Sequence, residues 1–211
     1  MASIRQWSID DVFCTSRGSK IANLKCDDGN KCAYTPSTGH VRIPFEPSTF
    51  DKDPTASRLN LVLECDEELQ AEIKSFDAWL IQYLTEHSER ILKKAMTSEQ
   101  VEAGYSRCLK APVKVPPAGK KYKPTLKTKI DLDGRYAVRC WNTDGESVSP
   151  PHTWKNLKLK PKLIFSHLWI MGNQFGVVVR ITDAQLADYD PDEDVVMVNP
   201  FERAQLNPAT H

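Results

Sequence analysis

Cations and flat rings alternate with apolar residues in the second half of the sequence, in the stretches "TLKTKID" and "RYAVRCWN". Successive side chains of a strand point to opposite faces. Lys127 and Lys129 therefore share one strand face, and Arg139 and Trp141 share another, each opposite apolar residues. A face that carries both kinds of side chain suits single-stranded nucleic acid, because cations hold phosphates and rings stack on bases of any sequence.

The aromatic residues of this half have two candidate roles. Trp141 and Trp154 adjoin polar loop residues, so base stacking and core packing are both open for them. Trp169 and Phe175 flank a turn on strands without a clear polar face, which favours core packing, with the border of a groove as the alternative. The full set of candidate contacts is Lys120, Lys121, Lys123, Lys127, Lys129, Arg139, Trp141, Trp154, Lys158, Lys160, Lys162, Trp169 and Phe175.

The formal net charge of zero hides an uneven distribution. Residues 1–106 carry 12 Lys/Arg and 17 Asp/Glu, residues 107–180 carry 15 and 4, and residues 181–211 carry 1 and 7. The balances are −5, +11 and −6. A basic block between acidic ones indicates a polyanionic partner, with acidic segments that restrain it. The alternative is that the lysines only solubilise a surface, but such solvation normally mixes the two signs.

The sequence lacks the motifs of common catalytic sites: G-x-S-x-G, H-E-x-x-H, a Walker loop and G-x-G-x-x-G are all missing. The carboxylate pairs Asp27/Asp28 and Asp131/Asp133 lie in predicted turns, where Asp is expected for its backbone hydrogen bonds. No cluster of Cys or His has the short spacing of a zinc site. We therefore expect no enzymatic activity, no cofactor and no metal.

The six cysteines are scattered and never form C-x-x-C. There is no apolar run of about 18 residues and no charged-then-apolar leader, so we expect neither a membrane span nor a secretory signal. Cysteines in such a chain are expected to be reduced thiols. The sequence thus predicts a reducing intracellular compartment, the nucleus or the cytoplasm.

Apolar periodicity predicts one long helix among strands. "RLNLVLEC" alternates as a half-buried strand, and from Asp66 to about Met96 apolar residues recur every three or four positions. Asp66 is the expected N-cap. The apolar stripe is expected to pack on the sheet, and a homodimer through a coiled coil is the weaker alternative because the pattern ends too soon. The proline- and lysine-rich segment 110–124 is expected to be an exposed extended loop.

Two hairpins are predicted after this loop, one turning at Leu132-Asp133-Gly134 and one at Gly172-Asn173. Strands that are not separated by regular crossover helices favour a Greek-key barrel over an α/β sheet. The expected fold is therefore mainly β with an inserted helix (α+β), a Greek-key barrel with a long amphipathic helix in mid-chain.

The order of elements resembles the OB-fold single-stranded DNA-binding proteins of short-tailed phages and nucleocytoplasmic large DNA viruses. The matching stretches are "KPTLKTKIDLDGRYAVRCW", "WKNLKLKPKLIFSHLWIMGNQFGVVVRITDAQL" and the acidic "DYDPDED". The resemblance implies an OB-fold barrel, an acidic tail that competes with DNA for a basic groove, and a viral origin with a viral replication site as a further location. Here "VVMVNPFERAQLNPATH" follows the acidic stretch, where the phage proteins end on an aromatic residue; Phe201 is the candidate for that role.

We assign residues 1–186 to one OB-fold-like nucleic-acid-binding domain, with a helical insertion over 66–104 and the Pro/Lys loop over 110–124. Residues 187–211 form an acidic tail that is expected to be mobile. The hypothesis is a non-catalytic, sequence-independent binder of single-stranded DNA in replication, recombination or repair. An RNA-binding protein and a protein-interaction module remain alternatives. The tail residues expected to contact replication proteins are Asp188, Asp190, Asp192, Glu193, Asp194 and Phe201.

Overall fold

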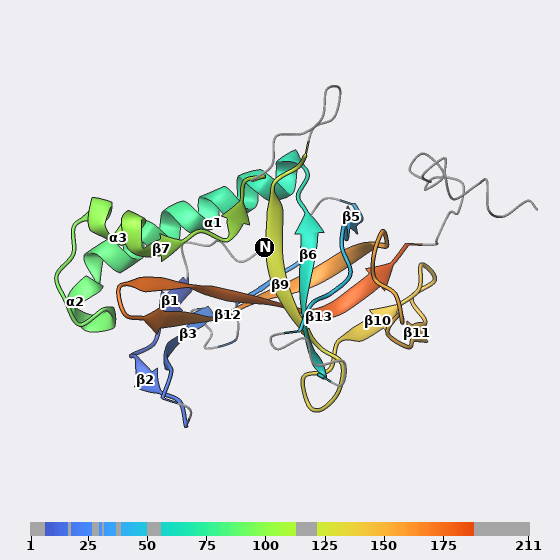
Figure 1. The fold of residues 1–211 in the computed structure, drawn as a ribbon, viewed down its shortest axis with the longest axis horizontal. Helices are drawn as coiled ribbons and strands as arrows, with labels where there is room; N and C mark the ends of the chain where they lie inside the picture. Colours follow the sequence, from blue (N-terminus) through green and yellow to red (C-terminus); the bar gives the residue numbers. More distant parts are fainter. Residues whose placement is uncertain are drawn as a thin grey trace, which may run out of the picture.

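The computed structural model describes residues 7–16, 18–26, 30, 32–36, 39–49, 56–112 and 122–187. Helices lie along one side of a long, bent sheet (Figure 1). The strands are β1 (Trp7–Ile9), β2 (Phe13–Cys14), β3 (Lys20–Cys26), β4 (Cys32–Tyr34), β5 (Val41–Arg42), β6 (Arg58–Glu64), β7 (Tyr105–Ser106), β8 (Leu109–Lys110), β9 (Thr125–Asp131), β10 (Arg139–Trp141), β11 (Ser147–Val148), β12 (Lys158–Met171) and β13 (Gln174–Leu186). The helices are α1 (Glu67–Glu86), α2 (Ser88–Ile91) and α3 (Ser98–Gly104).

The β12–β13 hairpin is the axis of the sheet. The main strand order is β1-β3-β12-β13-β10-β11, and β9 joins β13 in parallel while pairing antiparallel with β6. In Figure 1 β6 and β9 cross in front of the hairpin, and α1 runs along its upper side. The mainly β architecture with an inserted helix is thus confirmed, with α1 between β6 and β9 in the chain.

The predicted Greek-key barrel is confirmed only as a mainly β fold with an inserted helix, because the sheet is open. Closure would need a ladder between β5 and β6, but within the described residues β5 pairs only with β12 and β6 only with β9, apart from one bridge to Ser48. β5 has only two residues, too few for a second ladder. A 3.9 Å ion pair between Arg42 and Glu64 spans the gap instead.

One of the two predicted hairpins is confirmed and the other is wrong. β12 and β13 flank a two-residue turn in which Gly172 takes a φ of +59°, a value that glycine adopts without strain. The segment after β9 turns at Gly134 but does not return along β9. β10 instead pairs in parallel with the far end of β13, because the residues between β9 and β10 carry the chain across the sheet.

Helix α1 begins where the sequence predicts and ends earlier. The Asp66 side chain accepts a 2.9 Å hydrogen bond from Leu69 N, which confirms it as the N-cap. The predicted single helix to Met96 is divided, since His87 leaves the helical conformation at φ −116° and Lys93 takes a φ of +59°. The short helices α2 and α3 follow.

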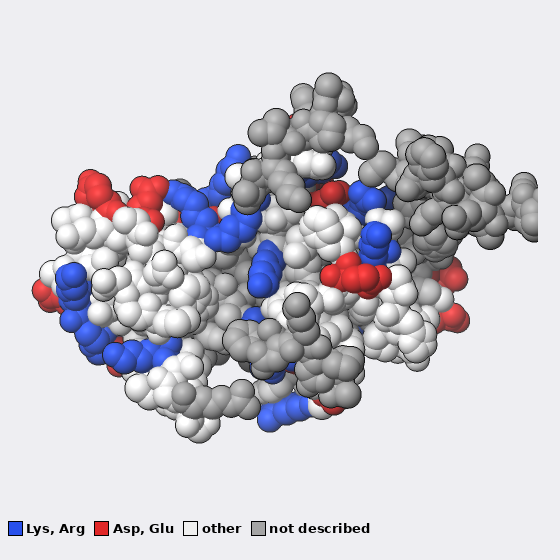
Figure 2. Space-filling model, viewed as in Figure 1, with Lys and Arg blue, Asp and Glu red and all other residues white. Residues whose placement is uncertain are grey.

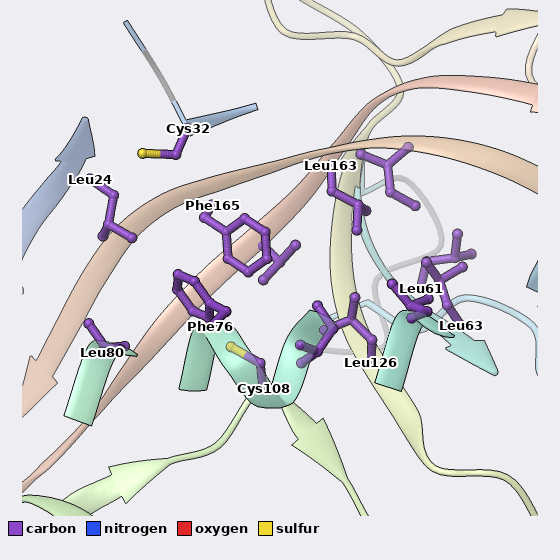
Figure 3. Close-up of a cluster of buried hydrophobic side chains, with 14 of the residues drawn as sticks. Leu24, Cys32, Leu61, Leu63, Phe76, Leu80, Cys108, Leu126, Leu163 and Phe165 are labelled. Atoms are coloured by element: carbon purple, nitrogen blue, oxygen red, sulfur yellow. The ribbon is translucent and has the colours of Figure 1, made fainter. Parts of the chain in front are cut away.

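The core lies between α1 and the inner face of the sheet. The rings of Phe76 on α1 and Phe165 on β12 have centroids 4.2 Å apart, and Trp7 of β1 packs on both. Figure 3 shows these two phenylalanines pointing toward each other, with Leu61 and Leu126 from β6 and β9 beside them. Apolar burial across these five elements fixes the orientation of the sheet relative to α1.

A buried carboxylate attaches the segment after α3 to α1. Asp77 on α1 is 1% exposed and accepts hydrogen bonds from Tyr105 Oη at 2.6 Å and Cys108 N at 3.0 Å. A longer contact of 3.5 Å comes from Leu109 N. Burial, with the neighbouring Cys108 and Asp77, raises the pKa of the Tyr105 hydroxyl, so this group stays a donor.

The described residues hold no disulfide, and none of the helices among them is long and apolar enough to cross a membrane. Burial raises the pKa of the Cys65 thiol to about 12 and that of Cys140 to about 11. A thiolate is the nucleophilic form of cysteine, so these two thiols are chemically inert near neutral pH.

Candidate nucleic-acid interface

The side of the sheet opposite the core, which we call the outer face, collects the polar and aromatic side chains of five strands. Strand alternation and cross-strand register place neighbours on it directly opposite one another. Its members are Ile21, Asn23 and Lys25 of β3; Lys160, Lys162, Ile164, His167 and Trp169 of β12; Gly176, Val178, Arg180, Asp183 and Gln185 of β13; Lys127, Lys129 and Asp131 of β9; and Arg58, Asn60 and Val62 of β6.

An aromatic row crosses one end of the outer face. Phe13 of β2 pairs with Ile21, Ile21 with Trp169, and Trp169 with Gly176. The Trp169 ring lies over Gly176, where an added Cβ would stand 2.8 Å from ring atom Cζ2. Glycine is therefore required for the tryptophan to lie flat on the sheet. Phe13 is 44% exposed and Trp169 half-buried, so both rings have a solvent side.

A cation cluster occupies the middle of the outer face, where β6, β9 and β13 meet. Arg58 Nε donates to Asp131 Oδ1 at 2.5 Å, and Arg180 Nη1 donates to Asp131 Oδ2 at 2.6 Å. Lys129 pairs in register with both Arg180 and Asn60. The Asp131 carboxylate thus holds two guanidinium groups in place, and Lys129 beside them leaves the cluster positive.

The pKa shifts at this cluster have a common electrostatic cause. Burial, together with Arg58, Arg180 and Lys127, lowers the pKa of Lys129. Burial, with Arg180, Lys129 and Arg58, lowers the pKa of His167 from 6.5 to about 4. A neighbouring cation is disfavoured where the potential is already positive. Such a site favours an anion for the same reason.

The far end of the outer face carries the strand faces that the sequence singled out. Lys160 lies opposite Gln185, which pairs with Trp141, and Lys162 lies opposite Asp183, which pairs with Arg139. Arg139 Nη2 and Asp183 Oδ1 are 2.7 Å apart, although Arg139 is 63% exposed. Burial would raise the pKa of Asp183, but hydrogen bonds from Arg139 and Thr182 lower it.

The predicted contact residues divide into four groups, one of which is the two buried rings, Trp154 and Phe175. Lys127, Lys129, Arg139, Trp141, Lys160, Lys162 and Trp169 lie on the outer face. Lys123 is exposed just before β9, and Lys158 is half-buried at the start of β12. Lys120 and Lys121 lie outside the described residues, as do the tail residues Asp188, Asp190, Asp192, Glu193, Asp194 and Phe201.

Two rings of the candidate set lie in the core and are removed from it, as the sequence favours for Phe175 and leaves open for Trp154. Trp154 and Phe175 are each 2% exposed, so neither ring offers a stacking surface. Phe175 packs on Tyr105 with ring centroids 6.3 Å apart, and Gly104 lies so close that an added Cβ would stand 2.8 Å from the Phe175 ring. Trp154 belongs to the main apolar core. The polar neighbours of Trp154 in sequence misled the prediction, because a loop residue can still point inward.

The sequence did not single out Arg58, Arg180, Phe13 and Tyr136 as candidate contact residues. Arg180 is a lone cation in the valine-rich strand "FGVVVRITD", and Arg58 begins the alternating strand "RLNLVLEC". Each is unremarkable alone, and only the β6–β9–β13 register brings them to one carboxylate. A single cation within an otherwise apolar strand was the one available signal.

The surface around β9 is basic on the side seen in Figure 2, where blue side chains lie over this strand near the centre of the view. The described residues contain no group of three His, Cys, Asp or Glu that could hold a metal ion. What the outer face presents chemically is therefore positive charge, hydrogen-bond donors and exposed ring faces. Groups of these kinds suit phosphates and bases.

Comparison with solved structures finds a structural likeness. No family model and no curated protein matches the sequence. The chain is similar in structure to a single-stranded DNA-binding protein from bacteriophage Enc34, solved in complex with single-stranded DNA, with a TM-score of 0.46 and 10% sequence identity. The match covers 87% of this chain and 93% of the phage protein.

Proposed function

We propose that the protein binds single-stranded DNA through the outer face, without catalysis and largely without sequence preference, and that it serves replication, recombination or repair. One observation carries the proposal: the aromatic row and the cation cluster lie on the same sheet face, joined along β13, where Gly176, Val178 and Arg180 follow one another on that face. Phosphates would lie along Arg58, Lys129 and Arg180, and bases would stack on Trp169 and Phe13. An open, bent sheet with a helix inserted between two strands supports an OB-fold-like variant.

The geometry sets the length of strand that the face holds. From Trp169 to Lys160 the chain of β12 covers nine residue steps, or about 30 Å at the usual rise of ~3.3 Å per residue. The outer face is thus long enough for several nucleotides, within the range of about 4–16 for one OB-fold module. Lys160, Lys162 and Arg139 would contact phosphates at the far end.

The test is a titration of a fluorescent oligo-dT of ~30 nucleotides at several salt concentrations. The logarithm of the association constant should fall linearly with the logarithm of the salt concentration, with a slope of about −0.7 per phosphate contacted. Tryptophan fluorescence is followed in parallel. Trp169→Ala should remove most of the quenching and weaken binding about tenfold, because a stacked base is worth about 1–3 kcal/mol. Trp154→Phe is the matched control and should bind as the unaltered protein does, since its ring is in the core.

No binding at ~50 mM salt would exclude the proposal, because phosphate contacts are strongest at low salt. The protein-interaction alternative would then take its place. Competition between oligo-U and oligo-dT distinguishes RNA from DNA, since the 2′-hydroxyl is what separates them at a given site.

A further inference from the structure

Two β-bulges interrupt the β12–β13 ladder, and both fall on hydroxyl residues. The register runs Phe165↔Val179 and then His167↔Val178, so Ser166 is unpaired. It runs Lys162↔Asp183 and then Leu163↔Ile181, so Thr182 is unpaired. Bulges re-aim side chains and are common beside functional sites. These two bulges therefore mark this part of the sheet as a candidate functional site.

Both bulged residues line the same cleft. Its volume is about 440 Å³, within the usual range of small-molecule sites. It forms where β3 leaves β12: β3 pairs with β12 only as far as Asn23, and β4 takes over at Phe165. The other polar lining residues are Lys25, Arg58, Asp131, Tyr136 and Arg180, and the apolar ones are Leu24, Ile164 and Ile181.

The chemistry of the cleft differs from that of the flat aromatic row. Asn23, Ser166 and Thr182 offer neutral donors and acceptors, the groups that read the edges of bases. The Tyr136 ring is 54% exposed, with the Arg135 guanidinium 5.7 Å from its centroid. Asp131 is the one carboxylate in the lining, and both its oxygens accept from arginines. Ser166 Oγ lies 3.1 Å from His167 Nδ1, and Thr182 donates a hydrogen bond to Asp183, so both hydroxyls are held in place at the cleft.

We propose that this cleft receives one unstacked base of the bound strand, with its phosphate on Arg58 and Arg180. The inference rests on the proposed function and goes beyond it, because the strand would be gripped at one position instead of only lying on a uniform platform. An extruded base in such a pocket is held by hydrogen bonds to its edge and by contact with a ring, here Tyr136. Binding should then be tolerant of sequence but intolerant of a missing base at that position.

The experiment is an abasic scan. A length series first defines the shortest oligo-dT that retains full affinity, which fixes the register, and a single abasic nucleotide is then placed at each position in turn. The cleft predicts one position where the loss is about tenfold greater than at the others, since only there does a missing base forfeit its stacking contact with Tyr136, worth about 1–3 kcal/mol. In Ser166→Ala/Thr182→Val that extra loss should disappear while the salt slope is unchanged. Ser147→Ala, an exposed hydroxyl on β11, is the matched control.

The wild-type scan decides the matter even if the double variant fails to fold. Equal losses at every position, with oligo-dT still bound, would overturn the base pocket and leave the proposed function intact. Absence of oligo-dT binding at ~50 mM salt would overturn both, because that condition favours any phosphate contact. A single intolerant position supports the pocket.

Discussion

Two buried aspartates each join separate elements of the fold, but through different kinds of donor. Asp77 is in the core and accepts from neutral donors, the Tyr105 hydroxyl at 2.6 Å and the Cys108 amide at 3.0 Å. Asp131 is on the outer face and accepts from two guanidinium groups, Arg58 at 2.5 Å and Arg180 at 2.6 Å. Both carboxylates are largely buried, at 1% and 8% exposure.

The donors decide what each aspartate does for the protein. Neutral donors around Asp77 are fixed on one chain segment, so their hydrogen bonds stabilise the fold and present nothing to solvent. The guanidinium groups around Asp131 bring more positive charge than the carboxylate removes, and Arg58 is 55% exposed. Asp77 is thus a structural centre, whereas Asp131 is a positioning residue for cations. We therefore predict that substitutions around Asp77 lower the stability of the fold, whereas substitutions around Asp131 weaken binding.

The largest effect is expected from Asp77→Ala. Removal of the carboxylate leaves the Tyr105 hydroxyl and the Cys108 amide buried without an acceptor, and hydrogen bonds to charged groups are worth about 1.5–3 kcal/mol each. The free energy of unfolding in urea should fall by about 3 kcal/mol or more. Asp144→Ala, which removes an exposed aspartate, is the control and should leave the urea midpoint unchanged.

Affinity for oligo-dT should be unaffected in Asp77→Ala at temperatures where the variant is folded, because Asp77 is not on the outer face. An unfolding free energy within ~0.5 kcal/mol of the unaltered protein, the usual span for neutral surface changes, would mean that the Asp77 cluster is not a structural centre.

The second effect is on binding. Arg180→Gln and Arg58→Gln each remove one cation from the cluster, so affinity for oligo-dT should fall about tenfold and the salt slope by about 0.7. Thermal stability should change little for Arg58, which is exposed. Arg107→Gln is the matched control. Arg107 is also an exposed arginine paired with a carboxylate, Glu102, but it lies just after the helical insertion and outside the cation cluster. This variant should bind oligo-dT as the unaltered protein does. Equal losses of affinity in all three variants would mean that binding depends only on the net charge of the protein.

The two sites also differ in how far the sequence could predict them. The helix containing Asp77 was predictable, because the apolar spacing and the Asp66 cap are local signals. The β12–β13 hairpin was predictable for the same reason, with Gly172 at its turn. Alternation also placed Lys127 and Lys129 on one face correctly, since a strand's period is local.

The Asp131 cluster was not predictable from one sequence. Its three cations come from β6, β9 and β13, and the parallel contact between β9 and β13 is a single register pair, Lys129↔Arg180. Asp131 and Asp133 were assigned to a turn for their backbone hydrogen bonds, whereas the Asp131 side chain in fact accepts from distant arginines. The burial of Trp154 could not be predicted for the same reason, because the burial of a loop residue depends on tertiary packing. Long-range register leaves no local trace in the residues.

The smallest effect expected is the part of the pH dependence that comes from His167 on the outer face. Burial and the cations Arg180, Lys129 and Arg58 lower the pKa of His167 to about 4 in the folded protein, against 6.5 ordinarily. Between these values the unfolded chain binds a proton that the folded chain does not, so the free energy of unfolding falls as pH decreases from about 6.5 to about 4. Burial instead raises the pKa of Tyr105 and Cys108, so these groups near Asp77 gain no charge in this range.

His167→Gln removes this titration from both states, so its urea midpoint should decline less steeply on acidification than that of the unaltered protein. His152→Gln is the control, because His152 is exposed and outside the cluster, and it should follow the unaltered protein. Urea unfolding at a series of pH values between neutrality and about 4 measures all three proteins. Parallel curves for His167→Gln and the unaltered protein would mean that the three cations do not act on this ring. A flatter curve would show that burial and the neighbouring cations together lower the pKa of His167, on the same strand as Trp169.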